Sequence, residues 1–139
     1  MTDLTMKDVM ASYSEDALDL ASQMGISLDY SEHSIKILDE ILEEYHRGLP
    51  RGIKELFVRS PTEEDIIQMS KIWGGYLGEV IRLNIGGEWG ISENFMESIC
   101  LTINDTEIYP PAKVNKRIIN GKEDGIFIYY QVIKEGNYV

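Results

Sequence analysis

The sequence predicts an α+β fold with N-terminal helices, a long central helix, a small three-stranded antiparallel meander and a C-terminal helical segment. Three observations lead to this prediction. Apolar residues recur at helical intervals before residue 86, three short strand-like segments separated by turn residues follow, and a proline pair at residues 110–111 opens a further helical pattern. We expect residues 1–139 to form one domain, with residues 1–25 as a candidate for an appended helical segment.

The first predicted helix is short. Ser12 and Glu15 have the spacing of a capping box, in which the two side chains bond backbone N–H groups that a helix start leaves unpaired. We therefore expect this helix to begin at Ser12 and to end at Gly25, because glycine readily adopts the left-handed conformation that closes many helices. An extended connector at residues 26–30 should follow.

A second capping spacing, Asp29 with Glu32, predicts a helix that runs to about His46 and stops at Gly48. Its apolar residues recur at the intervals of one helical face, which predicts that they enter the core. These residues are Ile35, Leu38, Ile41, Leu42 and Tyr45. Residues 48–59 should form a loop, with at most one short turn at residues 53–57.

The central helix has the clearest start signal. Ser60-Pro61-Thr62-Glu63 combines a serine cap, a proline at the first helical position and a glutamate three residues after the serine, and the helix should reach residue 84 or 85. This corresponds to about 37 Å at 1.5 Å per residue, enough to cross the domain. A helical projection leaves only a narrow polar stripe, so the helix should be largely buried. The stripe consists of Gln68, Lys71, Gly75, Glu79 and Arg82.

Three glycines, Gly74, Gly75 and Gly78, lie inside this central helix. Each costs about 1 kcal/mol relative to alanine in a helix interior, so the sequence must gain something in return. Gly74 and Gly78 fall on a face of small and apolar residues. We therefore expect the sheet or another helix to pack closely against that face.

The predicted meander consists of strands at residues 88–92, 99–103 and 106–109, with a tight turn at Asn104-Asp105. Pro110-Pro111 should end it and start a helix over residues 112–120 that Gly121 stops. In that helix we expect two residues to face inward, Val114 and Ile118, and three to face outward, Lys113, Lys116 and Arg117.

The last segment, residues 126–133, is ambiguous. Its residue types favour a strand, whereas Asp124 as a cap and the helical spacing of its apolar residues favour a helix. The residues with this spacing are Ile126, Phe127, Tyr130 and Ile133. We favour the helix.

Residues 73–121 resemble a group of uncharacterised bacterial domains. Proteins of this group share a tryptophan–glycine helix, a glycine–glutamate pair, a strand tryptophan and a proline followed by a lysine–arginine pair. The matching motifs are Trp73-Gly74, Gly78-Glu79, Gly86-Gly87-Glu88-Trp89, Pro110, Lys116-Arg117 and Asn120-Gly121. Gly75 and the N-terminal half lie outside the match. The resemblance implies the order helix, meander, helix, and it assigns no activity to these residues.

The composition limits the classes of function. A formal charge of −11 repels phosphate backbones, which disfavours nucleic-acid binding and favours a basic partner. No apolar run approaches the roughly 18 residues that would cross a bilayer. Residues 1–4 lack the pattern of a secretion signal. Cys100 is the single cysteine, which fits a reducing compartment, so we expect a cytoplasmic protein without membrane contact.

The sequence supports no catalytic group, cofactor or metal. Cys100 lies in a predicted strand far from both histidines, so a buried structural thiol is the favoured interpretation. His33 and His46 fall on different faces of their helix and should not share a metal. No glycine cluster has the spacing of a phosphate-binding loop.

Glu79 and Glu88 are the carboxylates that acid–base chemistry would use. A glutamate held beside Trp89 would have a raised pKa, since burial disfavours the charged form. The structural alternative is that Glu79 forms an ion pair with Arg82, or with a lysine–arginine pair of the next layer, Lys116 and Arg117. We favour the ion pair.

Two charged clusters remain. The helix predicted before residue 48 carries two like-charge pairs at four-residue spacing, and Arg47 should relieve one of them by pairing with Glu43. The cluster comprises Asp39, Glu40, Glu43 and Glu44. A solvated helix face is the favoured interpretation, and a docking site for a basic protein is the alternative. The patch of Lys113, Lys116 and Arg117 should balance internal carboxylates, with anion or partner binding as its alternative.

Our leading hypothesis is a non-enzymatic cytoplasmic binding protein, in one version an immunity-type protein whose acidic helix blocks a basic toxin. The alternative is an enzyme or small-ligand binder with a cleft between central helix and sheet. This cleft would use Glu79, Arg82, Glu88, Trp89 and Arg117. The sequence leaves open whether the chain forms homo-oligomers.

Overall fold

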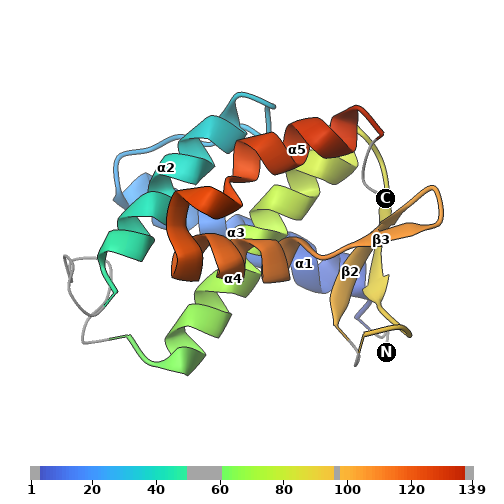
Figure 1. Ribbon diagram of the computed structural model, residues 1–139, viewed down its shortest axis with the longest axis horizontal. Helices are drawn as coiled ribbons and strands as arrows, with labels where there is room; N and C mark the ends of the chain where they lie inside the picture. The colour runs from blue at the N-terminus through green and yellow to red at the C-terminus, as the bar shows by residue number, and fades with distance from the viewer. Residues whose placement is uncertain (1–3, 50–60, 96–97, 137–139) are drawn as a thin grey trace.

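The computed structural model describes residues 4–49, 61–95 and 98–136. Five α-helices, one short 3₁₀ helix and a three-stranded antiparallel sheet occur in these ranges (Figure 1), which confirms the predicted α+β class. In chain order the elements are α1 (Met6–Gln23), α2 (Ser34–Arg47), α3 (Glu63–Asn84), β1 (Glu88–Ile91), β2 (Ile99–Ile103), β3 (Thr106–Ile108), α4 (Pro110–Asn120), η1 (Gly121–Asp124) and α5 (Ile126–Lys134).

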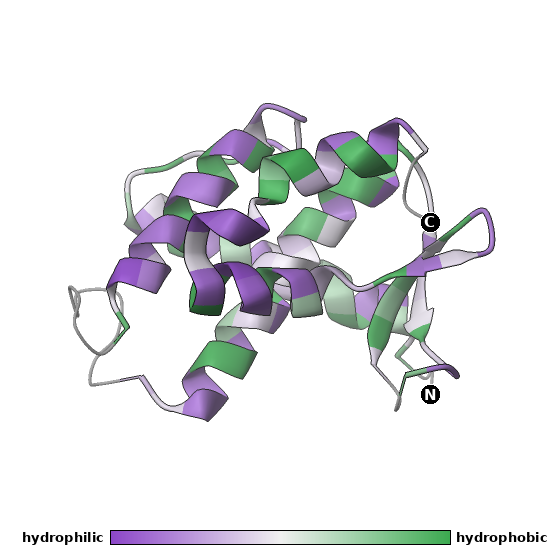
Figure 2. Ribbon diagram, in the orientation of Figure 1, coloured by the Kyte–Doolittle hydropathy of each residue, from purple (hydrophilic) through white to green (hydrophobic). Residues whose placement is uncertain are grey.

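Helix α3 is the element around which the others are arranged. Helices α1 and α4 pack along it, and α2 and α5 lie together above α4. The sheet lies at the end of the molecule opposite α2 (Figure 1). Figure 2 shows hydrophobic residues along α3 and β2, whereas α2 alternates between hydrophobic and hydrophilic faces. The predicted burial of α3 is confirmed over its second half, where Trp73, Tyr76, Leu77, Val80 and Ile81 are fully enclosed.

Helix α1 begins earlier than predicted. Thr5 caps it, because its hydroxyl accepts from the Asp8 N–H at 3.2 Å and the Asp8 carboxylate accepts from the Thr5 N–H at 3.1 Å. The predicted start at Ser12 is therefore wrong. The end is confirmed, since Gly25 has a φ of 77° and the Ile26 N–H bonds the Ala21 carbonyl, as in a Schellman motif. Helix α1 contributes three residues to the shared core: Met10, Ala17 and Ala21.

Helix α2 has the predicted buried face, and all five of its expected core residues are enclosed. Its predicted capping box is wrong. The Asp29 carboxylate accepts from the Ser31 N–H, and the hydroxyl of Ser31 accepts from the Ser34 N–H at 3.1 Å. Glu32 instead reaches α5, where it accepts hydrogen bonds from Tyr130 and Lys134.

Helix α3 is capped by Thr62 with Asp65, whose side chains and backbone N–H groups bond each other at 2.8 and 3.1 Å. The helix thus begins after Pro61, which is not its first helical residue. Its end at Asn84 is confirmed. The predicted cap Ser60 and the predicted loop and turn at residues 50–59 lie outside the described residues.

The expected close approach at Gly74 and Gly78 is confirmed. A Cβ at Gly74 would lie 2.5 Å from the Pro111 Cα of α4, and a Cβ at Gly78 would overlap the Trp89 ring of β1. Gly75 was placed on the polar stripe, and this is wrong. A Cβ there would lie 3.0 Å from the Tyr13 Cβ, because α1 covers that side of α3.

The meander has the predicted strands and turn. The sheet order is β1-β2-β3, Trp89 pairs with Leu101, and Leu101 pairs with Ile108. Asn104 and Asp105 both have positive φ, 47° and 68°, as a two-residue hairpin turn requires. The favoured helix at residues 126–133 is confirmed as α5. No helix in the described ranges has the length and apolar character that crossing a bilayer demands.

Candidate functional site

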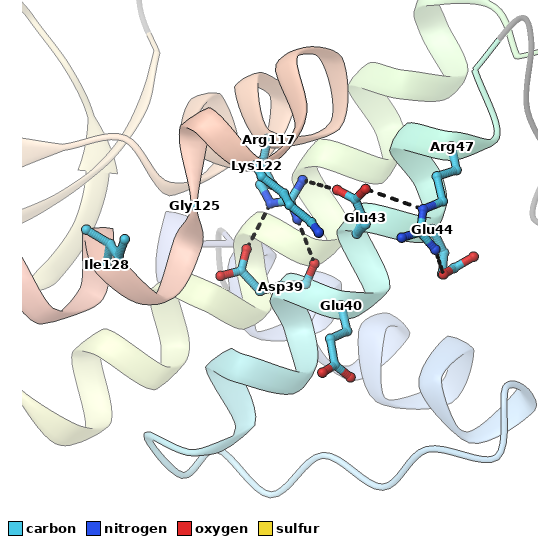
Figure 3. Close-up of a pocket in the computed structure, with 9 residues that line it drawn as sticks. All are labelled: Asp39, Glu40, Glu43, Glu44, Arg47, Arg117, Lys122, Gly125 and Ile128. Atoms are coloured by element: carbon cyan, nitrogen blue, oxygen red, sulfur yellow. Dashed lines mark hydrogen bonds and ion pairs between the residues drawn. The ribbon is translucent and has the colours of Figure 1, made fainter.

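A solvent-open groove of about 500 Å³ lies between α2 and the segment formed by η1 and α5. We call it the α2–α5 groove. Figure 3 shows its lining side chains, with Arg47 at one end and Ile128 at the other. The lining consists of Asp39, Glu40, Glu43, Glu44, Arg47, Arg117, Lys122, Gly125 and Ile128. All four residues of the predicted acidic cluster on α2 therefore lie at one concave surface.

Arg117 crosses from α4 to this acidic face. Its Nε donates to Asp39 Oδ1 at 2.9 Å, its Nη1 donates to Glu43 Oε1 at 2.9 Å, and its Nη2 donates to the Asp39 carbonyl at 3.2 Å (Figure 3). Only 3% of the side chain is exposed, so the prediction that Arg117 faces outward is wrong. Because α4 packs on α2, the guanidinium of Arg117 reaches the carboxylates of Asp39 and Glu43.

Asp39 has a second role, because its carboxylate also caps α5. It accepts hydrogen bonds from the backbone N–H groups of Ile126 and Phe127, both at 3.0 Å. These groups have no partner within the helix, and a negative charge at a helix N-terminus is favourable. Asp124, the predicted cap, instead accepts from Lys113 at 3.2 Å and from Asn120 at 2.8 Å. Asp39 thus holds α2, α4 and α5 together.

The four carboxylates of α2 therefore divide into two sets. Burial raises the pKa of Glu43, but the hydrogen bond and the charge of Arg117 outweigh it and leave this pKa below its ordinary value. Asp39 and Glu43 are thus both held within the fold by Arg117. Glu40 has no ion-pair partner in the described part of the chain and points away from Arg117 (Figure 3). Glu44 pairs with Arg47 at 2.9 Å, and both side chains are about half exposed.

Three lining residues were not found by sequence reasoning: Lys122, Gly125 and Ile128. Lys122 belongs to η1, and Ile128 is a large apolar residue of α5 that is 69% exposed. The helical projection of residues 126–133 contained a signal for Ile128, because it falls outside the face formed by Ile126, Tyr130 and Ile133. The groove thus has exposed carboxylates on α2 and an exposed apolar side chain at its other end.

A second polar cluster lies where α3 meets β1. Arg82 binds Glu79 through two hydrogen bonds, from Nε at 2.6 Å and from Nη2 at 3.1 Å, and Trp89 Nε1 donates to the same carboxylate at 3.0 Å. The favoured ion pair of Glu79 is therefore present. The structure does not gather the five residues of the alternative cleft, since Glu88 is exposed and Arg117 lies in the α2–α5 groove.

The raised pKa of Glu79 that the acid–base alternative requires does not occur. Burial does favour its neutral form, but the hydrogen bonds from Arg82 and Trp89, together with the charge of Arg82, outweigh burial and lower the pKa. Glu79 and Trp89 satisfy each other's polar atoms and are both less than 10% exposed. This arrangement fastens β1 to α3 beside Gly78.

We predict that Glu79→Gln lowers the free energy of unfolding by about 2 kcal/mol at pH 7, because a buried charge-assisted pair is lost. The folded-state pKa lies below the ordinary value of 4.5, so the pair stabilises the fold above that pH and is lost as the pH falls through the folded-state pKa. Urea unfolding should show the difference from wild type shrinking below pH 4.5. Glu88→Gln, on an exposed residue, is the control, and pH-independent differences for Glu79→Gln would contradict this account.

Cys100 and His46, the other candidates for chemistry, are engaged in contacts within the fold. Cys100 is 2% exposed, and burial raises the pKa of its thiol, which disfavours the reactive thiolate. His46 donates from Nδ1 to the Ile118 carbonyl at 2.7 Å. Within residues 4–49, 61–95 and 98–136, no three His, Cys, Asp or Glu side chains gather as metal ligands would.

Comparison with known proteins found no matching family model, no similar curated protein and no similar solved structure. The resemblance of residues 73–121 to uncharacterised bacterial domains therefore stays a prediction, and the site must be argued from its own geometry.

Proposed function

We propose that this chain is a non-catalytic binding protein that takes a basic segment of a protein partner into the α2–α5 groove. The groove itself is the observation that carries the proposal. It places the exposed carboxylates of Glu40 and Glu44 in one groove with the exposed side chain of Ile128, which lies at the end opposite Arg47 (Figure 3). Lysine or arginine side chains would meet the carboxylates, and an apolar residue of the same segment would cover Ile128.

The groove suits recognition because its walls are fixed. Asp39 and Glu43 are already bound by Arg117, and Asp39 also holds the first turn of α5. A partner therefore meets a preformed surface and does not have to order it, which lowers the cost of binding. The carboxylates that remain accessible to a partner are Glu40, which has no ion pair among the described residues, and Glu44, whose pair with Arg47 is about half exposed.

Long-range electrostatics would also favour a basic partner. The chain carries 24 acidic and 13 basic residues, so its field attracts a basic protein and accelerates the encounter. A small basic toxin that the chain neutralises is one partner of this class. Such an interaction should weaken steeply as the salt concentration rises.

The test compares two charge reversals of equal size. Glu40→Lys with Glu44→Lys alters the groove, whereas Glu15→Lys with Asp16→Lys alters exposed residues of α1 by the same net charge. The probes are a fluorescein-labelled decalysine peptide and the basic proteins encoded by neighbouring genes. We expect the groove variant to weaken binding by at least about tenfold and the α1 variant by less than about threefold in fluorescence anisotropy.

Equal effects of the two variants would mean that net charge alone attracts the probe, and this would overturn the proposed site. Salt-insensitive binding, or no binding of any of these probes, would overturn the proposed partner class. Circular dichroism at 222 nm confirms beforehand that both variants are folded.

A further inference from the structure

A second groove, of about 490 Å³, lies on another side of the molecule, between α3, the start of β2 and the first turns of α4. We call it the α3–α4 groove. Its lining is largely apolar, with two lysines. The apolar residues are Ile67, Ile99, Pro111 and Ala112, and the lysines are Lys71 and Lys116.

The apolar lining is open to solvent. Ile67 is 44% exposed although it belongs to the most buried helix of the fold, and Ile99 is partly exposed at the start of β2. Exposed apolar surface in a concave setting is typical of ligand sites, and a volume of several hundred Å³ suits a small organic molecule.

The two lysines of the groove carry no ion pair among the described residues. Neither Lys71 nor Lys116 forms an ion pair within the described part of the chain, although acidic residues outnumber basic ones by 24 to 13. Nearby Lys113, by contrast, pairs with Asp124 at 3.2 Å. The expectation that the patch around Lys116 balances internal carboxylates thus holds for Lys113 and Arg117 through ion pairs, whereas Lys116 acts on Asp124 only through its charge at longer range.

The groove is also preformed. Asn115 donates to the Ser70 hydroxyl at 3.2 Å, and that hydroxyl donates to the Ile66 carbonyl at 2.7 Å. Gly74 lets Pro111 approach the backbone of α3. These contacts hold α3 and α4 at a fixed separation, so a ligand would not have to create the site.

We propose that the α3–α4 groove binds an amphipathic organic anion, a small molecule with an aliphatic body and one carboxylate. The body would cover Ile67 and Ile99, and the carboxylate would lie at Lys71 and Lys116. Charge complementarity supports this occupant, because two lysines without an ion pair among the described residues border an apolar surface in an otherwise acidic protein. The inference is independent of the proposed binding of a basic protein. It concerns a different groove, and its ligand is an anion and not a cation.

Isothermal titration of the full chain with decanoate tests the proposal, with decan-1-ol and decylamine as neutral and cationic analogues. We expect saturable binding of decanoate, and binding at least about tenfold weaker for both analogues. Lys71→Gln with Lys116→Gln should weaken decanoate binding by at least about tenfold. Lys7→Gln with Lys36→Gln, which makes the same change in charge at exposed residues outside both grooves, should leave it within about twofold.

Ala112→Trp provides a second variant, because the exposed Ala112 lies on the groove wall and a large ring there would fill the groove without disturbing the core. It should abolish decanoate binding while the far-ultraviolet circular dichroism stays unchanged. The proposal is overturned if decanoate shows no saturable binding to the wild type, if decan-1-ol binds equally well, or if the lysine variant or Ala112→Trp binds decanoate as the wild type does.

Discussion

Gly74→Ala is expected to lower the free energy of unfolding by about 3 kcal/mol, although alanine is the better helix former by about 1 kcal/mol. The added methyl group would lie 2.5 Å from the Pro111 Cα and 2.8 Å from its nitrogen. Both are backbone atoms, so no side-chain rotation can relieve the clash, and α4 would have to move away from α3. Calorimetry should show a melting temperature lower by about 10 °C.

Gly90→Ala is the matched control for this change. Gly90 lies in β1, and a Cβ at this position would meet nothing within 4 Å. We expect its effect on the free energy of unfolding to stay within about 1 kcal/mol. If Gly74→Ala were as stable as Gly90→Ala, the close packing of α4 on α3 would be refuted.

Arg117→Met should lower the free energy of unfolding by about 4 kcal/mol, because it leaves Asp39 without a cation and Glu43 with only its longer contact to Arg47, at 3.4 Å, in a largely buried place. Asp39 and Glu43 retain only 23% and 15% side-chain exposure, so water can solvate them only in part. Methionine keeps the apolar stem of the side chain, and the loss therefore reports on the charge. Chemical denaturation measures it directly.

Two further variants show whether the loss of stability in Arg117→Met comes from the carboxylates of Asp39 and Glu43 that Arg117 no longer holds. Arg47→Met removes an arginine that is 53% exposed and that pairs with Glu43 and Glu44 of α2. It should lower the free energy of unfolding by less than about 1 kcal/mol. Adding Asp39→Asn and Glu43→Gln to Arg117→Met should recover at least half of the loss, since no unpaired carboxylate then remains. A similar cost for Arg117→Met and Arg47→Met would contradict the proposed role of Arg117.

The order of elements could be predicted because it depends on local patterns. The buried face of α2, the turn at Asn104-Asp105 and the glycine contacts of α3 each follow from a few neighbouring residues. Capping residues were predicted less well. Ser12 and Glu15 have the right spacing by chance inside a helix, whereas the true capping boxes have Asp8 and Asp65 at the position where glutamate or glutamine is typical.

The candidate site could be predicted only in part. The acidic cluster of α2 was evident as a set of charges, but its division into bound and available carboxylates depends on Arg117, 74 residues after Glu43. The cap of α5 comes from Asp39, 87 residues before Ile126. Such long-range contacts follow from the packing of α2, α4 and α5, and no local pattern encodes them.

The most direct test of the central claim, that the α2–α5 groove receives a basic segment, is a nuclear magnetic resonance titration of ¹⁵N-labelled protein with decalysine. We expect the largest amide shifts at Glu40, Glu44 and residues 122–128, and their disappearance in the variant with Glu40→Lys and Glu44→Lys. Shifts centred on residues 15–19 of α1, or spread evenly over the acidic surface, would contradict the claim.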